Sequence, residues 1–166
     1  PIGDMSHFML KRSIVMSIPN LYVISNGNTI SKNSKPEPKD LETIQANYEV
    51  GVAPKALAFD GENMWVVNAG ELDDVEPGIV TKLNLMGEKI GSFDVGRNPS
   101  DIVFDGESMW ISNAFDNTIT HLNLSGEHLG TFPVGEGPVS LAFDGRSIWV
   151  ANIEDNSISK LTMPFQ

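Results

Sequence analysis

Seven carboxylates stand where the chain is expected to form loops, and together they could make an acidic binding surface. Four lie in the stretch GELDDVEPG and three in two other loops: Glu71, Asp73, Asp74, Glu76, Asp116, Glu154 and Asp155. Ca²⁺ takes several carboxylate oxygens, but the stretch lacks the D-x-[DN]-x-[DN]-G order of a calcium loop. We therefore predict a solvated acidic surface that could bind a partner, with no metal site and no cofactor, and leave Ca²⁺ as the open alternative.

Side chains suited to catalysis are few. The histidines are His7, His121 and His128. Repeated segments of the chain place His121 where sister copies carry Lys82 and Lys160, a position that we predict to be outer and solvated. The sequence has no G-x-S-x-G, no H-E-x-x-H, no phosphate-binding loop and no dinucleotide fingerprint. These absences favour a protein that is not an enzyme.

Three segments of the chain repeat one pattern. They read VGVAPKALAFDGENMWVVNA from Val50, VGRNPSDIVFDGESMWISNA from Val95 and VGEGPVSLAFDGRSIWVANI from Val134. Phe104 and Phe143 are 39 residues apart, whereas Phe59 and Phe104 are 45 apart, and the extra residues lie in GELDDVEPG. A period of this length is typical of solenoids and propellers.

Each repeat unit predicts four short strands. In one copy they are expected at 101–104, 109–113, 118–124 and 128–134, with turns at Asp105-Gly106 and Ser125-Gly126-Glu127. Four antiparallel strands repeated at about 40 residues are typical of a β-propeller blade. The predicted fold is therefore all-β, a propeller of about four four-stranded antiparallel blades.

We predict one propeller domain over residues 1–166. Its expected parts are a clasp strand at 1–11, a degenerate blade at 12–50, a blade with a loop insertion at 51–95, a blade at 96–134, and a blade lacking its own fourth strand at 135–166. The segment Ile2-Gly3-Asp4-Met5 matches the fourth-strand segment Ile90-Gly91-Ser92-Phe93 and could complete the last blade. The alternatives are an unrelated N-terminal arm, a dimer that closes one eight-bladed ring by strand exchange, and an open arc within a larger assembly.

Aromatic and amide residues recur once in each copy. We predict that the recurring aromatics are mostly buried between blades, with sugar stacking as the alternative: Phe59, Phe104, Phe143, Trp65, Trp110 and Trp149. We expect the residues that end the second strands to hydrogen-bond loop backbone: Asn68, Asn113 and Asn152.

Composition narrows the function further. Asp and Glu number 22 against 11 Lys and Arg, a net charge of −11, which argues against nucleic acid and anionic membranes as partners. The sequence has no cysteine, no stretch of about 20 apolar residues and no visible secretory signal. We expect no membrane insertion, and a cytoplasmic or virion-associated location.

The repeat unit resembles known bacterial repeats. It reads P-x-x-[LI]-x-F-D-G-x-x-[MI]-W-[VI]-x-N, followed by [DN]-[NS]-x-I-[ST]-[KH]-L, and is similar to the YVTN, NHL and virginiamycin-B-lyase-like propeller repeats over residues 50–161. The resemblance implies a propeller fold. Such repeats occur in lyases, lactonases, surface proteins and phage tail proteins, and the lyase-like members use a His and a Glu at the central channel, often with a metal.

We expect a non-catalytic recognition or scaffold module that binds protein or glycan through its loop face. One alternative is a structural or adhesion component of a larger assembly, such as a phage virion or tail. Another is a small propeller enzyme of the lyase or lactonase type, which the lack of a channel His and Glu pair disfavours.

Overall fold

The described part of the protein is built of β-strands alone. The computed structural model describes residues 47–71 and 76–162, and within these ranges it holds eleven strands and no helix. The predicted clasp at 1–11 and nearly all of the predicted degenerate blade lie outside the described residues. The strands are β1 (Pro54–Phe59), β2 (Met64–Asn68), β3 (Ile79–Leu83), β4 (Lys89–Asp94), β5 (Pro99–Phe104), β6 (Ser108–Asn113), β7 (Thr118–Asn123), β8 (His128–Pro133), β9 (Pro138–Phe143), β10 (Ser147–Asn152) and β11 (Ser157–Thr162).

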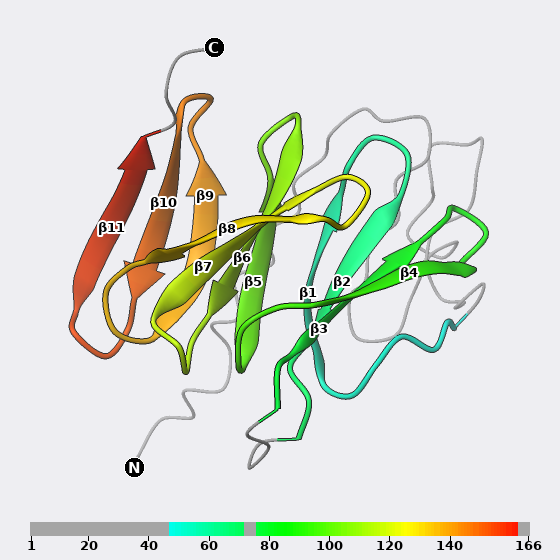
Figure 1. The fold of residues 1–166 in the computed structure, drawn as a ribbon, viewed down its shortest axis with the longest axis horizontal. Helices are drawn as coiled ribbons and strands as arrows, with labels where there is room; N and C mark the ends of the chain where they lie inside the picture. Colours follow the sequence, from blue (N-terminus) through cyan, green and yellow to red (C-terminus); the bar gives the residue numbers. More distant parts are fainter. Residues whose placement is uncertain (1–46, 72–75, 163–166) are drawn as a thin grey trace, which may run out of the picture. The chain divides into compact units, whose positions relative to one another are not determined.

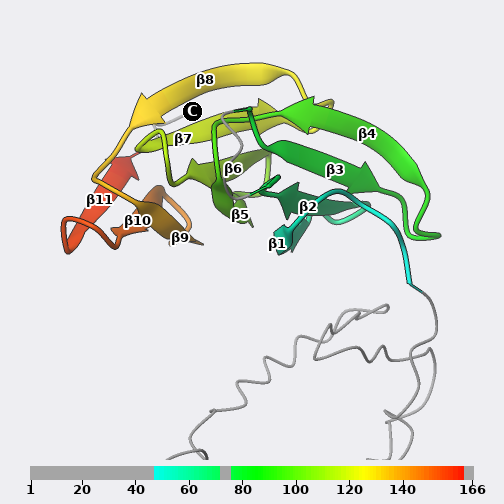
Figure 2. The ribbon, with the colours of Figure 1, turned by 90° about the horizontal axis from the view of Figure 1, so that it is seen from below.

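The strands form three antiparallel sheets that follow one another along the chain. Their strand orders are β1-β2-β3-β4, β5-β6-β7-β8 and β9-β10-β11, so each strand pairs with its neighbour in sequence. The first strands pack on one another, β1 on β5 and β5 on β9, while β4 and β8 lie on the outer side (Figures 1 and 2). These are propeller blades, and the predicted all-β fold of four-stranded antiparallel units is confirmed.

The turn between the first two strands of each blade depends on its Asp-Gly pair. In the middle blade, Asp105 Oδ1 accepts the backbone N–H groups of Glu107 and Ser108 at 2.8 and 2.7 Å. Gly106 has φ +104°, a conformation that costs an L-residue with a side chain far more than it costs glycine. The prediction of a tight turn here is therefore correct, and the same bonds recur at Asp60 and Asp144.

The same aspartates also hold the tryptophans of the second strands. The indole Nε1–H donates to the carboxylate at 2.8 Å in Trp65–Asp60 and at 2.7 Å in Trp110–Asp105. Burial raises the pKa of Asp105, but hydrogen bonds from Trp110, Glu107 and Ser108 outweigh it, so the pKa lies below its ordinary value. The repeated D-G-x-x-x-W motif is thus one unit that fixes both the turn and the aromatic ring.

Apolar side chains fill the two spaces between the three blades. Trp65 and Val80 of the first blade pack with Ile102 and Met109 of the second. Trp110 and Ile119 of the second blade pack in the same way with Ile148 and Val150 of the third. The middle blade therefore contributes its two faces to two different cores, and the first and third blades contribute to one core each.

The recurring aromatics do not all follow the prediction of burial. Trp65 and Trp110 are buried, but Trp149 is 38% exposed, because no further blade lies against it in the described part of the chain. Phe59, Phe104 and Phe143 are half-buried at the ends of their strands. Burial of a repeated side chain thus depends on the neighbouring blade as well as on its own strand.

His121 lies in a different environment from the predicted solvated position. Its ring stacks on Trp110 with 3.8 Å between centroids and 10° between planes, and it is half-buried. The equivalent lysines of the other two blades also lie over their tryptophans. Lys82 Nζ is 4.7 Å from the ring centroid of Trp65, and Lys160 Nζ is 4.4 Å from that of Trp149. The cause is register, because each of these residues pairs directly with its tryptophan across the second and third strands.

The asparagines that end the second strands bind the neighbouring strand and loop. Asn113 Nδ2 donates to the hydroxyls of Thr118 and Thr120, and its Oδ1 accepts the backbone N–H of Gly96 at 3.0 Å. A Cβ at Gly96 would lie 2.5 Å from the Asn113 side chain, so glycine is needed for this close approach. The predicted bond to loop backbone is found in the middle blade.

Candidate functional site

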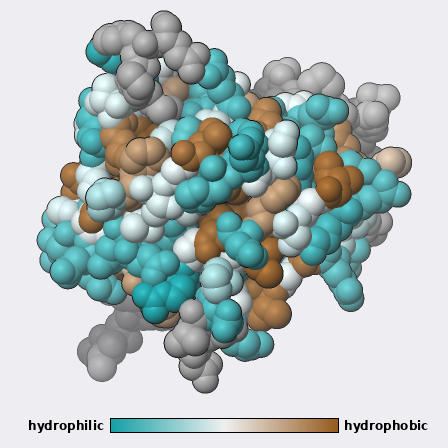
Figure 3. Space-filling view, viewed as in Figure 1, coloured by the Kyte–Doolittle hydropathy of each residue, from teal (hydrophilic) through white to brown (hydrophobic). Residues whose placement is uncertain are grey.

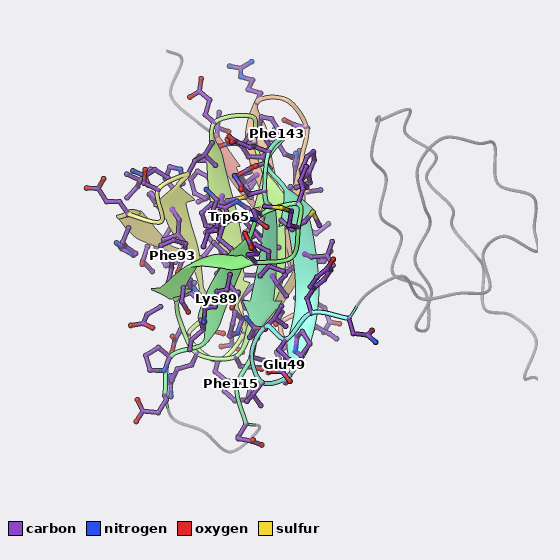
Figure 4. The ribbon with its side chains drawn as sticks, turned by 90° about the vertical axis from the view of Figure 1, so that its right-hand side faces the viewer. Glu49, Trp65, Lys89, Phe93, Phe115 and Phe143 are labelled. Atoms are coloured by element: carbon purple, nitrogen blue, oxygen red, sulfur yellow. The ribbon has the colours of Figure 1, made fainter. Side chains whose placement is uncertain are left out.

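The described members of the predicted acidic set lie at one end of the blades, which we name the loop face. It comprises the β2–β3, β6–β7 and β10–β11 loops together with the inter-blade links 95–98 and 134–137. In Figure 1 these loops lie at the lower end of the sheets, and in Figure 4 Phe115 and Glu49 mark that end, opposite Phe143. Glu71 and Glu76, the two described carboxylates of the insertion, are exposed. Asp73 and Asp74 lie outside the described residues.

Asp116 is engaged with the link that enters its own blade. Its Oδ1 lies 2.6 Å from Arg97 Nε, and its Oδ2 accepts the Arg97 backbone N–H at 2.7 Å. Arg97 in turn donates its own side chain toward the carbonyl of Phe115. Asp116 therefore has a structural task, fastening the inter-blade link to the β6–β7 loop, and its charge is balanced by an arginine.

The third blade has the same contact between link and loop, but a glutamate takes the place of the arginine. Asp155 Oδ2 accepts the backbone N–H of Glu136, which occupies the position of Arg97, at 3.0 Å. Hydrogen bonds from the hydroxyl of Ser157 and from the Glu136 backbone hold the pKa of Asp155 below its ordinary value. Glu154, next to Asp155, is exposed. The link that carries Glu136 and the loop that carries Glu154 and Asp155 are also joined by the Glu154 N–H donating to the Glu136 carbonyl, and no ion pair balances these three acidic residues within the described residues.

An open groove joins two of the predicted loops. It has a volume of about 400 Å³ and lies between the first and second blades. Asp116 and the end of the insertion at Pro77 both line it, beside Asp94 and His128. The fold therefore brings Asp116 close to the insertion, whereas Glu154 and Asp155 lie one blade farther on.

Two exposed apolar side chains on the loop face were not predicted. Phe115 is exposed in the β6–β7 loop, and Ile153 is exposed in the β10–β11 loop. Neither belongs to an inter-blade core. A sequence signal for them did exist, because an apolar residue inside a tight turn next to Asp serves no purpose in the turn itself. On the face that carries β4 and β8, apolar groups are broken up by hydrophilic ones (Figure 3).

A Ser, a His and an Asp meet inside the middle blade. The hydroxyl of Ser108 donates to Asp105 Oδ2 at 2.8 Å, and His121 Nε2 lies 2.7 Å from the same hydroxyl. In a nucleophilic triad the histidine bridges serine and aspartate. Here the serine is the bridge, it is buried, and its proton points to the aspartate. The arrangement anchors Trp110 and does not activate a nucleophile.

The surroundings of His121 lower its pKa. Burial lowers the pKa of His121, the charge of Asp105 acts in the opposite direction, and His128 adds to the lowering. The net pKa lies below the ordinary value of histidine, so the ring is neutral at pH 7. Over the described residues no group of three or more His, Cys, Asp or Glu side chains has the geometry to hold a metal ion.

Comparison with known proteins yields structural neighbours only. No protein-family model matches the sequence, and no curated protein matches it. A putative 6-phosphogluconolactonase from Bacteroides fragilis superposes with TM-score 0.63 at 15% identity, over 88% of this chain and 47% of its own. A functionally unknown protein from Desulfotomaculum acetoxidans gives TM-score 0.60 at 18% identity, over 83% and 45%.

A third neighbour is the hydrazine synthase of Kuenenia stuttgartiensis. It superposes with TM-score 0.57 at 17% identity, over 74% of this chain and 36% of its own. This chain therefore spans less than half of each solved chain that it matches here. The described ranges contain no helix, and therefore none that is long and apolar enough to cross a membrane. At these identities the likeness concerns the fold, and it agrees with the strand order and repeat pattern: the chain is a β-propeller repeat protein.

Proposed function

We propose that this chain is a non-catalytic recognition or scaffold module that binds a protein partner through its loop face. The observation that carries the proposal is the pairing of exposed apolar residues with unbalanced carboxylates. Phe115 and Ile153 stand exposed in equivalent loops of neighbouring blades, and Ile153 is followed directly by Glu154 and Asp155. Exposed apolar groups rimmed by charge are typical of protein-binding surfaces.

The character of the surface favours a basic and partly apolar protein segment. Carboxylates without a partner cation on the loop face would attract Lys and Arg, while Phe115 would supply the apolar anchor. A glycan is less well matched, because two of the three repeated tryptophans on which a sugar could stack, Trp65 and Trp110, are buried, and the exposed ring of the loop face is Phe115. The exposed Trp149 has the ammonium group of Lys160 over its ring.

Photo-cross-linking at two positions tests this proposal. A benzoyl-phenylalanine is introduced at Phe115 on the loop face or at the exposed Glu107 in the β5–β6 turn at the opposite end. The proposal predicts a specific cross-linked protein for position 115 and none for position 107 in extracts of the source cell. Equal cross-linking at both positions, or none at 115, would contradict it.

A further inference from the structure

The β6–β7 loop and the link into the third blade are bonded to each other across two blades. Asn117, two residues after Phe115, accepts the Gly137 backbone N–H at its Oδ1, at 2.9 Å. Its backbone carbonyl accepts the N–H of Val134 at 3.0 Å. The loop that carries Phe115 is therefore held in place against this link by two hydrogen bonds.

Gly137 is the point where the third blade joins the same unit. A Cβ at Gly137 would lie 2.6 Å from Cγ of Glu154 and 3.1 Å from Cγ2 of Ile153, so both of these side chains lie over the glycine. The Ile153 N–H also donates to the Gly137 carbonyl at 2.9 Å. Because Asn117 holds the N–H of the same glycine, the β6–β7 loop and the β10–β11 loop meet at Gly137.

Phe115 and Glu154 occupy equivalent positions in successive blades. Each is the second residue after the asparagine that ends the second strand of its blade. The backbone N–H of Phe115 donates to the Arg97 carbonyl at 3.3 Å, and the N–H of Glu154 makes the same bond to the link of its own blade, at 3.1 Å. Stacked sheets lie about 10 Å apart, so the loop face has an apolar position and an acidic position separated by about that distance.

The charges around these two positions differ. Beside Phe115, the carboxylate of Asp116 is paired with Arg97 at 2.6 Å. No ion pair balances Glu154 among the described residues. A cationic group is therefore attracted to the third blade more than to the middle one. Ile153, 65% exposed beside Glu154, offers an apolar surface to the aliphatic stem of a Lys or Arg.

We infer that the loop face binds an extended segment in which a large apolar residue and a Lys or Arg are three residues apart. The apolar side chain packs on Phe115, and the cationic group binds at Glu154. This inference rests on the proposed recognition function and specifies the partner of that same surface.

The spacing follows from the geometry of an extended chain. In the polyproline II conformation the chain rises about 3.1 Å per residue with three residues per turn, so residues i and i+3 lie on one face about 9 Å apart. An α-helix rises about 1.5 Å per residue and needs about seven residues for the same distance. Short isolated helices are marginal in water, whereas unfolded chains already populate polyproline II, so the extended segment has the smaller cost of ordering.

Peptide selection tests this spacing. The full chain is used to select binders from a random peptide library displayed on yeast, and the inference predicts enriched peptides with an apolar and a basic residue three positions apart. Glu136→Arg combined with Glu154→Arg should select Asp or Glu at the same separation from the apolar residue. Phe115→Ser should lose the preference for the apolar residue. The matched control, Glu107→Arg at the opposite end of the blades, should select the same peptides as the unmodified protein.

A second pair of variants tests the bond that joins the two blades. Asn117→Gly removes the Oδ1 acceptor but tolerates the φ of +55° at this position, and it should broaden the range of selected separations. Asn156→Gly, at the same φ of +55° in the β10–β11 loop, is the control and should leave the separation at three. Circular dichroism spectra of all variants should match that of the unmodified protein.

Three results would overturn the inference. They are selected peptides with a separation of about seven, peptides with no fixed separation or no selected peptides at all, and a basic residue retained by the charge-reversed variant. Cross-linking at position 115 then separates this failure from that of the recognition function. A specific cross-linked protein at that position keeps the function and rejects the extended segment, whereas its absence rejects both.

Discussion

The imidazole of His121 lies flat on the indole of Trp110, with 3.8 Å between their centroids, and its Nε2 lies 2.7 Å from the hydroxyl of Ser108. The two sister blades place a lysine over the tryptophan instead. A histidine at this place makes the middle blade sensitive to pH in a range where the sister blades are not, because lysine stays charged there.

The first prediction concerns this sensitivity. Burial lowers the folded-state pKa of His121 below its unfolded value of 6.5, so the unfolded chain binds the proton more readily. The contribution of neutral His121 to the free energy of unfolding is fully present above pH 6.5 and is lost as the pH falls toward the folded-state pKa. The unfolding midpoint should therefore drop between pH 7.5 and 5.5. The His121→Phe variant should show a smaller drop in the unfolding midpoint, and a variant of the exposed His128, His128→Gln, should show the same drop as the unmodified protein. Identical pH profiles for the unmodified protein and both variants would contradict the assignment of this pH dependence to His121.

The second prediction concerns the aspartate that holds the turn and the tryptophan. Asp105→Ala removes a charged acceptor from the indole of Trp110 and from two backbone N–H groups. The free energy of unfolding should fall by about 2 kcal/mol, the range for hydrogen bonds to a charged group. Urea denaturation measures this loss. Glu107→Ala in the same turn is the control and should change stability by less than about 0.5 kcal/mol.

The third prediction concerns the core between blades. Trp110→Ala should lower the free energy of unfolding by about 3–5 kcal/mol, because it empties a buried aromatic site between the second and third blades. The exposed Phe115→Ala should cost less than about 0.5 kcal/mol. A loss under about 1 kcal/mol for Trp110→Ala would show that the ring is not part of the core.

The fourth prediction concerns the close approach of Gly96 to Asn113. Gly96→Ala places a methyl group about where the Asn113 side chain now lies, and overpacking of this kind costs about 1–3 kcal/mol. Ser100→Ala, on the strand that follows, should have a smaller effect. Chemical denaturation of the two variants provides the comparison, and a neutral Gly96→Ala would contradict the described packing.

Much of the fold could be read from the sequence because the repeat aligns the blades with one another. The strand expected at 109–113 is observed as Ser108–Asn113, and the turn at Gly106 has the positive φ that the Asp-Gly pair predicts. Local patterns of this kind depend on residues near one another in the chain, so a single sequence contains them.

The features that could not be predicted depend on neighbours distant in the chain. Trp149 repeats a buried residue but lacks a blade against it, and His121 was placed by analogy with lysines whose own contacts with tryptophan could not be foreseen. In the candidate site, Asp116 is balanced by Arg97 from an earlier loop, whereas the position of Arg97 is Glu136 in the next blade. Only the folded contact between each inter-blade link and the loop of the blade that it enters reveals which carboxylates are engaged.

The affinity of the partner captured at Phe115 tests most directly whether the loop face is the recognition surface. Isothermal titration calorimetry compares the unmodified protein with Phe115→Ser and Glu154→Lys, and with Glu107→Lys at the opposite end as the control. If the loop face is the recognition surface, the dissociation constant should rise at least tenfold for the two loop-face variants, a loss of about 1.4 kcal/mol of binding free energy. The control should bind with an unchanged dissociation constant. Unchanged binding by both loop-face variants would contradict it.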